Sequence, residues 1–502
     1  MELLMTGIQV VFQLEVLLVI AMGVLLGVVF GALPGVSATM SIVLCISFTY
    51  SMNPVVAISF LAAVYCASIT GGSITAILFK IPGTPSSAPT TLDGYPMAKR
   101  GEAGKALTLA LLASGFGGLF SAVVMFMLTQ PLMKLALRFS SPEQFAVCAL
   151  GIGILSFVDS DRPLNTFVSA LIGIWIATIG QDRFSSVARF TFGTVKLLDG
   201  IESLPFMIGM FAVVEILDNI RNPEDTKDMT KDAVEGKFKV TGIADFMKTK
   251  WTALRSAVIG TVVGIIPGAG ATIASFMSYS VESKLNKSPE TMGQGNPHGI
   301  VASETANNAA TGGAMVPLLS MGIPGSNAAA MMLTALSIHG VQMGPLLLRS
   351  QPEYLSATFM SMILANIVMV VVSIYVAKVF AQVLKVPYYI LGSLIFVLAL
   401  TGTYAYQSNM FDLTVMFIAG AFGYFFKKYG FNISALILGM VLGGDMEYYF
   451  RRSLLMYGNV GSFFQRPIFT GIVVLFALVT VFQVFSMLRK RSNAKKQKTQ
   501  QP

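Results

Sequence analysis

The sequence predicts an all-α polytopic membrane protein of about 11–13 transmembrane or re-entrant helices in two related halves. Three observations support this fold class. The 502 residues are 54% hydrophobic and only 12% charged, whereas a soluble domain carries about 25% charged residues. Apolar runs near the roughly 20 residues that cross a bilayer recur along the chain, and the mean hydropathy is +0.71. The second half of the chain also repeats motifs of the first half.

The apolar runs give the expected elements in chain order. Several are too short, too long or interrupted by glycine and proline, so we expect both whole and partial crossings. The first run lacks a basic region before it and a small-residue cleavage site, which predicts a retained membrane helix, not a signal peptide. The runs lie at residues 8–30, 54–79, 106–136, 143–158, 164–180, 202–217, 253–275, 305–340, 354–384, 387–402, 411–426, 432–444 and 466–488.

Glycine and proline motifs recur between the halves. The stretch GVVFGALPGVSATM (27–40) aligns with GTVVGIIPGAGATI (260–273) at an offset of 233 residues, with seven of fourteen positions identical. The tripeptides TGG (70–72) and IPG (81–83) also recur in the second half. The expected organisation is a first transmembrane repeat at 1–217, a cytoplasmic linker at 218–250, a second transmembrane repeat at 251–452, an additional C-terminal transmembrane helix at 453–488 and a basic cytoplasmic tail at 489–502.

The distribution of charge predicts the orientation. An odd number of crossings in each repeat, plus one additional helix, places the N-terminus in the periplasm and the linker and C-terminus in the cytoplasm. The tail RKRSNAKKQK (489–498) has six basic residues and no acid, which fits the cytoplasmic side under the positive-inside rule. This arrangement is an inverted-topology repeat, common in secondary transporters. A parallel repeat is the alternative, because Arg451 and Arg452 fit the cytoplasmic side better.

Two proline-glycine motifs, FKIPGTP (79–85) and LLSMGIPGSNA (318–328), interrupt apolar runs. Irregular backbone at membrane depth is tolerated only where protein buries it or where it lines a cavity. A helix that starts at such a break directs free N–H groups toward an anion. The alternative is that glycine and proline only kink helices or allow close packing. Because the clusters are paired by the repeat and flanked by hydroxyl and amide side chains, we favour an anion site. The candidate substrate-binding residues are Thr70, Gly71, Gly72, Ser73, Pro82, Gly83, Thr84, Asn307, Asn308, Thr311, Gly312, Gly313, Pro324, Gly325 and Ser326.

The stretch SETANNAATGGA (303–314) places Glu304, Asn307, Asn308 and Thr311 at helical spacing on one face. A polar stripe inside a membrane is costly unless it has a function. Its oxygens suit Na⁺, and Glu304 is alternatively a proton carrier; the simpler interpretation is a polar helix start near water. The candidate coupling-ion residues, which include two Gly-x-x-Pro-Gly motifs, are Gly31, Pro34, Gly35, Thr39, Gly264, Pro267, Gly268, Thr272 and Glu304.

Other functional classes find little support in the sequence. Two histidines are too few for a histidine-based metal site, and the three cysteines lie in apolar segments, where they predict packing residues, not disulfides. Much of the net charge of +9 lies in the tail, so it does not indicate a nucleic-acid partner. No Gly-x-x-x-x-Gly-Lys-Ser/Thr phosphate loop occurs. We predict neither enzymatic activity nor a cofactor, with Na⁺ as a candidate coupling ion.

Two charged residues near the first proline-glycine motif have open roles. Lys80 either balances substrate charge or lies at the membrane edge, and the second interpretation is favoured. Asp93 falls in a turn-rich polar segment after the motif.

Four stretches resemble the large membrane subunit (TctA-like) of the tripartite tricarboxylate transporters of bacteria, and the resemblance covers nearly the whole chain. They are GALPGVSATM, SITGGSITAILFKIPGTPSSAPTTLDGYPMAKRGEAGKAL, GIIPGAGATIASFMSYSVE and ETANNAATGGAMVPLLSMGIPGSNAAAMML. The resemblance implies a multi-pass permease of the bacterial inner (plasma) membrane that takes up carboxylates with an ion gradient and without ATP. It also implies two protein partners, a periplasmic substrate-binding protein and a small four-helix membrane subunit.

We therefore expect a secondary transporter that imports organic carboxylates, such as citrate-like tricarboxylates, by Na⁺ or proton symport. The core that carries the breaks would move relative to the other helices during alternating access. A channel-like facilitator, or a transporter of another small anion, is the alternative.

Overall fold

The computed structural model describes residues 2–33, 35–158, 162–221, 241–383, 388–478 and 480–481. It confirms the all-α polytopic membrane class. Within these residues, six helices are long and apolar enough to cross a membrane, and the β-strands form one two-stranded hairpin. Part of the expected linker and all of the basic tail lie outside the described residues.

The elements follow the chain in this order. The α-helices are α1 (Glu2–Val11), α2 (Leu14–Ala32), α3 (Ala38–Ile46), α4 (Pro54–Phe79), α5 (Ala88–Met97), α6 (Ala103–Ala136), α7 (Ser141–Val158), α8 (Pro163–Ala177), α9 (Ser203–Ile208), α10 (Val214–Arg221), α12 (Ile243–Lys248), α13 (Lys250–Ile265), α14 (Gly270–Leu285), α15 (Pro297–Met321), α16 (Asn327–Ile338), α17 (Leu347–Ser350), α18 (Pro352–Val383), α19 (Tyr388–Gln407), α20 (Met410–Lys428) and α21 (Ile433–Tyr457). The hairpin strands are β1 (Gly180–Gln181) and β2 (Ala188–Arg189), which lie between α8 and α9. A further apolar helix lies after α21, at Pro467–Leu478.

The chain forms two compact units. Unit 1 comprises residues 1–136 and 202–424, and unit 2 comprises residues 137–201 and 425–502. Unit 1 therefore holds both proline-glycine motifs, one from each expected repeat. The boundaries expected between the repeats remain a prediction.

Within unit 1 one close helix pair occurs in each half of the chain. In the first half α2 packs on α4, and in the second half α13 packs on α15. The motif glycines permit both close approaches. A Cβ at Gly31 would overlap the carbonyl of Ser68, and a Cβ at Gly264 would lie 2.5 Å from the carbonyl oxygen of Ala310. Small residues at such crossings let helix backbones touch.

Some elements differ from the ranges expected from hydropathy. The run at 8–30 is divided into α1 and α2 at Gln13, whose extended backbone (ψ 137°) ends the first helix. The run at 253–275 is two helices, because the Gly-x-x-Pro-Gly turn interrupts it as its composition predicts. The helix α5 forms in a segment expected to be only polar turns, where Pro89 occupies a position at the helix start.

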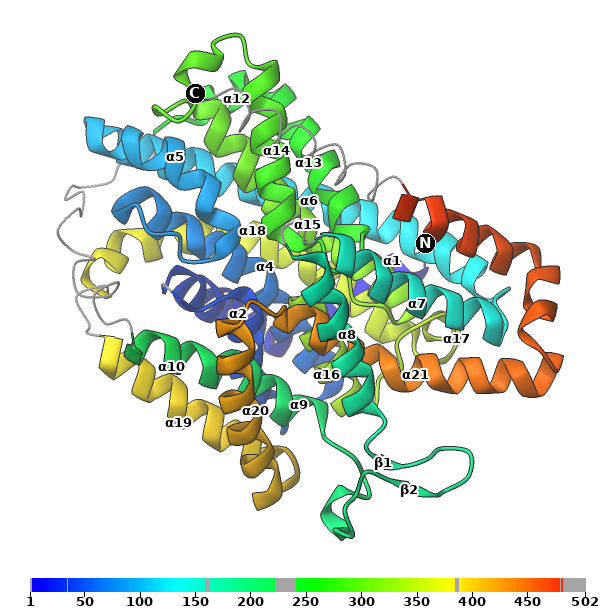
Figure 1. Ribbon diagram of the computed structural model, residues 1–502. Coiled ribbons are helices and arrows are strands. Elements are labelled where there is room, and N and C mark those ends of the chain that lie inside the picture. The colour runs from blue at the N-terminus through cyan, green and yellow to red at the C-terminus, as the bar shows by residue number, and fades with distance from the viewer. Residues whose placement is uncertain are drawn as a thin grey trace, which may run out of the picture. The chain divides into compact units, whose positions relative to one another are not determined.

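Unit 2 is organised by α8 and α21, which pack together along their length. A Cβ at Gly173 of α8 would overlap the carbonyl of Leu436, and one at Gly439 of α21 would overlap that of Ala170. An aromatic cluster around Phe463 packs against α7 and the end of α21. The β1–β2 hairpin extends beyond the end of α8 (Figure 1).

Candidate functional site

Each proline-glycine motif follows the C-terminal end of a buried helix. The helix α4 ends at Lys80, whose backbone is left-handed (φ 61°), and α15 ends at Gly322, which is also left-handed (φ 75°). Left-handed backbone is rare for a residue with a side chain such as Lys80. The chain then turns back: the Gly83 N–H donates to the Gly72 carbonyl (3.3 Å), and the Gly325 N–H donates to the Ala314 carbonyl (3.4 Å). Each motif thus folds back beside the preceding helix, about two turns before its end.

A short helical segment starts after each turn. Ser326 accepts from the N–H of Ala329 and so caps α16. After the first motif, the 3₁₀ turn η2 (Pro85–Ser87) leads into α5, and the hydroxyl of Thr84 lies 3.0 Å from those of Ser86 and Ser87. The two starts are therefore rich in hydroxyl groups.

A buried polar network joins α4 to α15 and reaches the first break. Thr70 of α4 donates to Asn308 of α15 (2.9 Å), and the Asn308 amide donates to Asn307 (2.8 Å). The Asn307 amide donates to the backbone carbonyl of Ser86 (3.4 Å). At the second break, the hydroxyl of Ser326 lies 3.0 Å from that of Tyr65 on α4. Figure 1 shows α15 near α6, α13 and α14, which pack around it.

Glu304 continues this network and is fully buried. Its carboxylate accepts from Thr90 of α5, from Ser114 of α6 (3.2 Å) and from the Asn307 amide (3.2 Å). Thr90 also lies 2.9 Å from the hydroxyl of Ser303. Among the described residues, no basic side chain lies within ion-pair distance of Glu304. The simpler interpretation, in which Glu304 lies near water at a polar helix start, is wrong for this structure, because Glu304 is fully buried.

The candidate substrate-binding residues fall into three groups in the structure. Thr70, Thr84, Asn307 and Asn308 belong to the polar network or to its edge at the first break, and Ser326 lies at the second break beside Tyr65. Ser73 and Thr311 donate to carbonyls of their own helices. The remaining residues are glycines at close helix contacts and prolines of the turns: Gly71, Gly72, Gly83, Gly312, Gly313, Gly325, Pro82 and Pro324.

The glycines show why the backbone approaches so closely. A Cβ at Gly72 would overlap the hydroxyl of Thr84 and would lie 2.5 Å from that of Ser87. A Cβ at Gly312 would instead lie 2.5 Å from the hydroxyl of Ser121, and one at Gly313 would overlap the carbonyl of Thr261. Gly72 therefore adjoins the first break, whereas the other two glycines serve helix packing.

The candidate coupling-ion residues are not gathered in one place. The Gly31 carbonyl adjoins Gly83, and the Gly264 carbonyl adjoins Gly325. The Gly268 N–H, in the turn that contains Pro267, donates to the carbonyl of Gly325 (3.0 Å). Each Gly-x-x-Pro-Gly motif thus packs on the proline-glycine motif of its own half. Glu304 has other contacts, with Thr90, Ser114 and Asn307.

The other members of this set have separate positions. Gly35 is left-handed (φ 87°), and a Cβ there would lie 2.7 Å from Glu215 Oε1. Thr39 is buried and Thr272 is half-buried. Pro34 lies outside the described residues.

Asp93 fastens α5 to the loop that precedes α15. Its Oδ1 accepts from the N–H groups of Gly293 (2.9 Å), Gly295 (2.8 Å) and Asn296 (2.7 Å). Its Oδ2 accepts from the Tyr279 hydroxyl (2.8 Å). Successive N–H groups around one carboxylate oxygen form a backbone nest for an anion, and here the protein's own side chain fills it.

Sequence reasoning missed the residues that complete the network. Tyr65, Ser86, Thr90 and Ser114 all make the contacts described above. Thr90 follows the first motif within a few residues, so its hydroxyl was a usable signal, whereas Ser86 contacts Asn307 through its backbone carbonyl. Tyr65 and Ser114 lie inside apolar helices, where single polar residues give no such signal. Lys80 is exposed, with Nζ 5.8 Å from the centre of the Tyr95 ring, and its position at the membrane edge stays a prediction.

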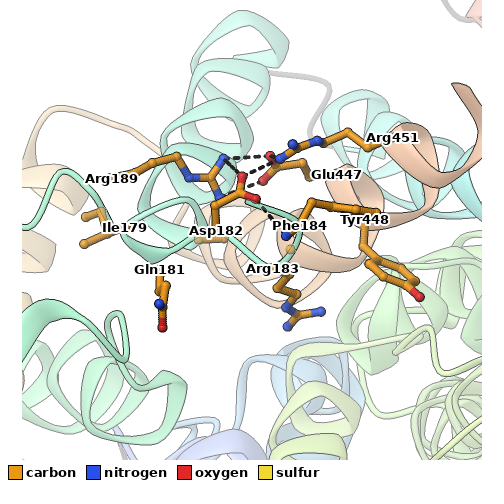
Figure 2. Close-up of a pocket in the computed structure, with 11 residues that line it drawn as sticks. Ile179, Gln181, Asp182, Arg183, Phe184, Arg189, Glu447, Tyr448 and Arg451 are labelled. Atoms are coloured by element: carbon orange, nitrogen blue, oxygen red, sulfur yellow. Dashed lines mark hydrogen bonds and ion pairs between the residues drawn. The ribbon is translucent and has the colours of Figure 1, made fainter. Parts of the chain in front are cut away.

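Unit 2 has a polar cavity of about 60 Å³ beside the hairpin, and its charges are paired. Arg189 binds Glu447 through two hydrogen bonds (2.7 and 3.1 Å), and Arg451 pairs with both Asp182 and Glu447. Figure 2 shows these four side chains converging, while Arg183 points away from them. Backbone N–H groups of Ser185 and Phe184 hold the pKa of the Asp182 carboxyl well below its usual range. Since the charges compensate one another, this cavity suits a structural anchor of the hairpin better than an anion site.

Comparisons with known proteins identify the family of the chain. The family model described as "Tripartite tricarboxylate transporter TctA family" matches residues 17–438. An Agrobacterium vitis protein described as "Uncharacterized 52.8 kDa protein in TAR-I ttuC' 3'region" is 33% identical over 470 residues, which cover 93% of each chain. A second Agrobacterium vitis protein, "Uncharacterized protein in TAR-II ttuC' 3'region", is 31% identical over 233 residues, or 46% of this chain and 96% of the relative. No solved structure matches the chain.

Proposed function

Because this chain belongs to the tripartite tricarboxylate transporter TctA family, we propose that it imports organic carboxylates, driven by a Na⁺ or proton gradient. The observation that carries this proposal is the buried polar network of Thr70, Asn307 and Asn308, which links α4 to α15 and reaches the first break at Ser86. Buried polar groups in a membrane are costly and mark functional sites.

The anion site that we propose lies between the two breaks. The starts of α5 and α16 both turn toward the middle of the neighbouring long helices, and the partial positive charge of a helix start favours an anion. Hydroxyls of Thr84 and Ser326, with the amides of Asn307 and Asn308, would donate to carboxylate oxygens. Interrupted helices of this kind form the substrate sites of several secondary transporters.

The coupling that we propose passes through Asn307. Its amide donates both to the Glu304 carboxylate and to the carbonyl of Ser86 at the first break. A proton or Na⁺ at Glu304 would neutralise the carboxylate to which the Asn307 amide donates. The amide could then donate to the substrate instead. One side chain therefore connects the group that takes the coupling ion with the turn that holds the anion.

Within unit 2, α8 and α21 run in the same direction. Asn165 near the start of α8 donates to the carbonyl of Gly430 just before α21, and Ile174 near its end contacts Gly443, so the two helices run parallel. The connection after α8 closes on itself, because the Gln181 N–H donates to the Leu198 carbonyl (2.8 Å). We propose the inverted topology on the distribution of charge along the chain.

The pairing of Arg451 removes an objection to this topology. Inversion places Arg451 on the periplasmic side, against the positive-inside rule. Asp182 and Glu447 neutralise its charge, so it should contribute little to orientation. We accordingly propose a bacterial inner-membrane protein with a periplasmic N-terminus and a cytoplasmic C-terminus.

The partners that we propose follow from the family. A tripartite system implies membrane partner subunits and a binding protein. We propose that these are a small four-helix membrane subunit and a periplasmic protein that delivers the carboxylate. The expected division into repeats at 1–217 and 251–452 also stays part of this proposal.

Uptake into proteoliposomes that contain the complete transporter tests the proposal. Replacing Asn307 with alanine should reduce uptake at least about 10-fold, because several hydrogen bonds of the network are lost. Ser320→Ala is the matched control, since this buried hydroxyl on the same helix donates only to its own Val316 carbonyl (2.6 Å). Gradient-independent uptake would instead identify a facilitator. Gly325→Leu is a poorer test, because a Cβ there would overlap the Gly264 carbonyl and disturb packing.

A further inference from the structure

Two serines of α14 carry hydroxyl groups for which the described residues provide no hydrogen-bond partner. Ser275 and Ser278 are buried, at 0% and 1% exposure, and neither hydroxyl has a hydrogen-bond partner. Other buried serines in helices usually donate to a carbonyl of the preceding turn, as Ser303 does to Gly299 (2.9 Å). A buried polar group without a partner is costly and rare, which indicates that something absent from the protein itself satisfies it.

The face of α14 that carries these serines is oriented by its neighbours. Ser275, Ser278, Tyr279 and Glu282 share one face because they are spaced by three, four and seven residues. On this face Tyr279 donates to Asp93 of α5 (2.8 Å), and Glu282 lies 3.3 Å from His298 Nδ1 at the start of α15. The face therefore looks toward α5 and α15, not toward lipid.

The contacts of α14 place the two serines between the second break and Asp93. At one end of α14, Gly270 adjoins Ser326 of the second break, and one turn beyond Ser275, Tyr279 reaches Asp93. The turn η2, which follows the first break and leads into α5, packs against α14. The helix that carries Ser275 and Ser278 therefore contacts segments of both breaks.

We propose that Ser275 and Ser278 form the α14 side of the anion site and bind an oxygen of the carboxylate substrate. This assignment rests on the proposed transport function and extends its site to a helix that neither the breaks nor the polar stripe of α15 includes. A serine hydroxyl donates to a carboxylate oxygen and also accepts from a substrate hydroxyl. The site would therefore suit hydroxylated carboxylates as well as simple ones.

The experiment compares Ser275→Ala, Ser278→Ala and the double variant in proteoliposomes of the complete transporter. Citrate, malate and succinate are the probes, and the anion with the fastest wild-type uptake is used for the variants. The double variant should raise the half-saturating concentration about 10-fold or more, the effect of losing one or two hydrogen bonds to an anion. Its melting temperature should not fall, because alanine removes unsatisfied buried hydroxyls. The control is Ser283→Ala, whose hydroxyl donates to the Tyr279 carbonyl (2.9 Å) on the same helix.

A second measurement probes the site without relying on the transport rate. A Ser275→Cys variant, in a background without the three native cysteines, should react with a small thiol reagent, and the transported anion should slow this reaction. An unchanged half-saturating concentration in the double variant, or labelling that the anion does not slow, would overturn the assignment. Absence of wild-type uptake for every probe would instead overturn the proposed transport function, and this assignment with it.

Discussion

Replacing Glu304 with glutamine is expected to separate substrate movement from the ion gradient. The carboxylate is buried and accepts from three side chains, Thr90, Ser114 and Asn307. Each hydrogen bond to a charged group contributes roughly 1.5–3 kcal/mol, while burying one ion costs several kcal/mol. Since the hydrogen bonds and the cost of burial are of similar size, binding of a proton or cation can decide whether the buried carboxylate is favourable. Glutamine keeps the size and one acceptor oxygen but cannot ionise.

The size of the effect follows from the energy of one charge in the membrane potential. One elementary charge moved through 100 mV corresponds to about 2.3 kcal/mol, or roughly a 50-fold concentration ratio. A Glu304→Gln variant that no longer moves one cation with each substrate should accumulate about 50-fold less substrate at that potential. Exchange of labelled for unlabelled substrate, which needs no gradient, should persist. The unfolding free energy should change by only about 1 kcal/mol, the value of one hydrogen bond.

The assay measures accumulation in proteoliposomes under an imposed potential, with and without Na⁺ and proton gradients. Ser320→Ala, on the same helix, is the control for a harmless change. Accumulation by Glu304→Gln that equals the wild type under every gradient would refute the role of Glu304 in coupling. Loss of both exchange and accumulation would show that Glu304 binds substrate or holds the site together instead.

Three further perturbations test other parts of the structure. Gly72→Ala should reduce uptake about 10-fold, because the added Cβ overlaps the Thr84 hydroxyl; Gly471→Ala, where a Cβ meets nothing within 4 Å, should leave uptake unchanged. Asp93→Ala should lower the melting temperature, since each N–H donor left unpaired costs about 1–3 kcal/mol; an unchanged melting temperature would mean that water replaces the carboxylate. The pKa of Asp182 is lowered in the folded protein, so its stabilising effect should hold above its ordinary value of 3.8 and decline as the pH falls below it. Melting between pH 7 and pH 3 should show this decline in the wild type and a smaller one in Asp182→Asn.

The membrane class and the helix breaks could be predicted because their signals are local. Hydropathy located α4 at 54–79, and the structure begins and ends this helix at the same residues. The two Ile-Pro-Gly motifs predicted interruptions, and both are turns in the structure. In contrast, the sequence could not divide 8–30 into two helices, because both parts are apolar and neither proline nor glycine marks the boundary at Gln13.

The candidate site was less predictable because its residues come from several helices. Periodicity within one segment brought Glu304, Asn307 and Asn308 together, and the structure places all three in one network. It could not select Ser114, because pairing between α6 and α15 depends on tertiary packing. The glycines were ambiguous for the same reason. Gly72 faces a hydroxyl and Gly313 faces a backbone carbonyl, yet their sequence contexts are alike.

The absence of buried basic residues bears on the reason for ion coupling. Among the described residues, the buried set includes Glu304, Asp93 and many hydroxyls but no lysine, arginine or histidine. A site made of hydroxyls, amides and helix starts stabilises an anion only through dipoles, which leaves the net charge of the substrate uncompensated. Moving that charge through the low-dielectric interior is costly, so a cation or proton that enters with the substrate lowers the barrier. This composition supports the symport that we propose, and uptake that persists without a gradient would contradict it.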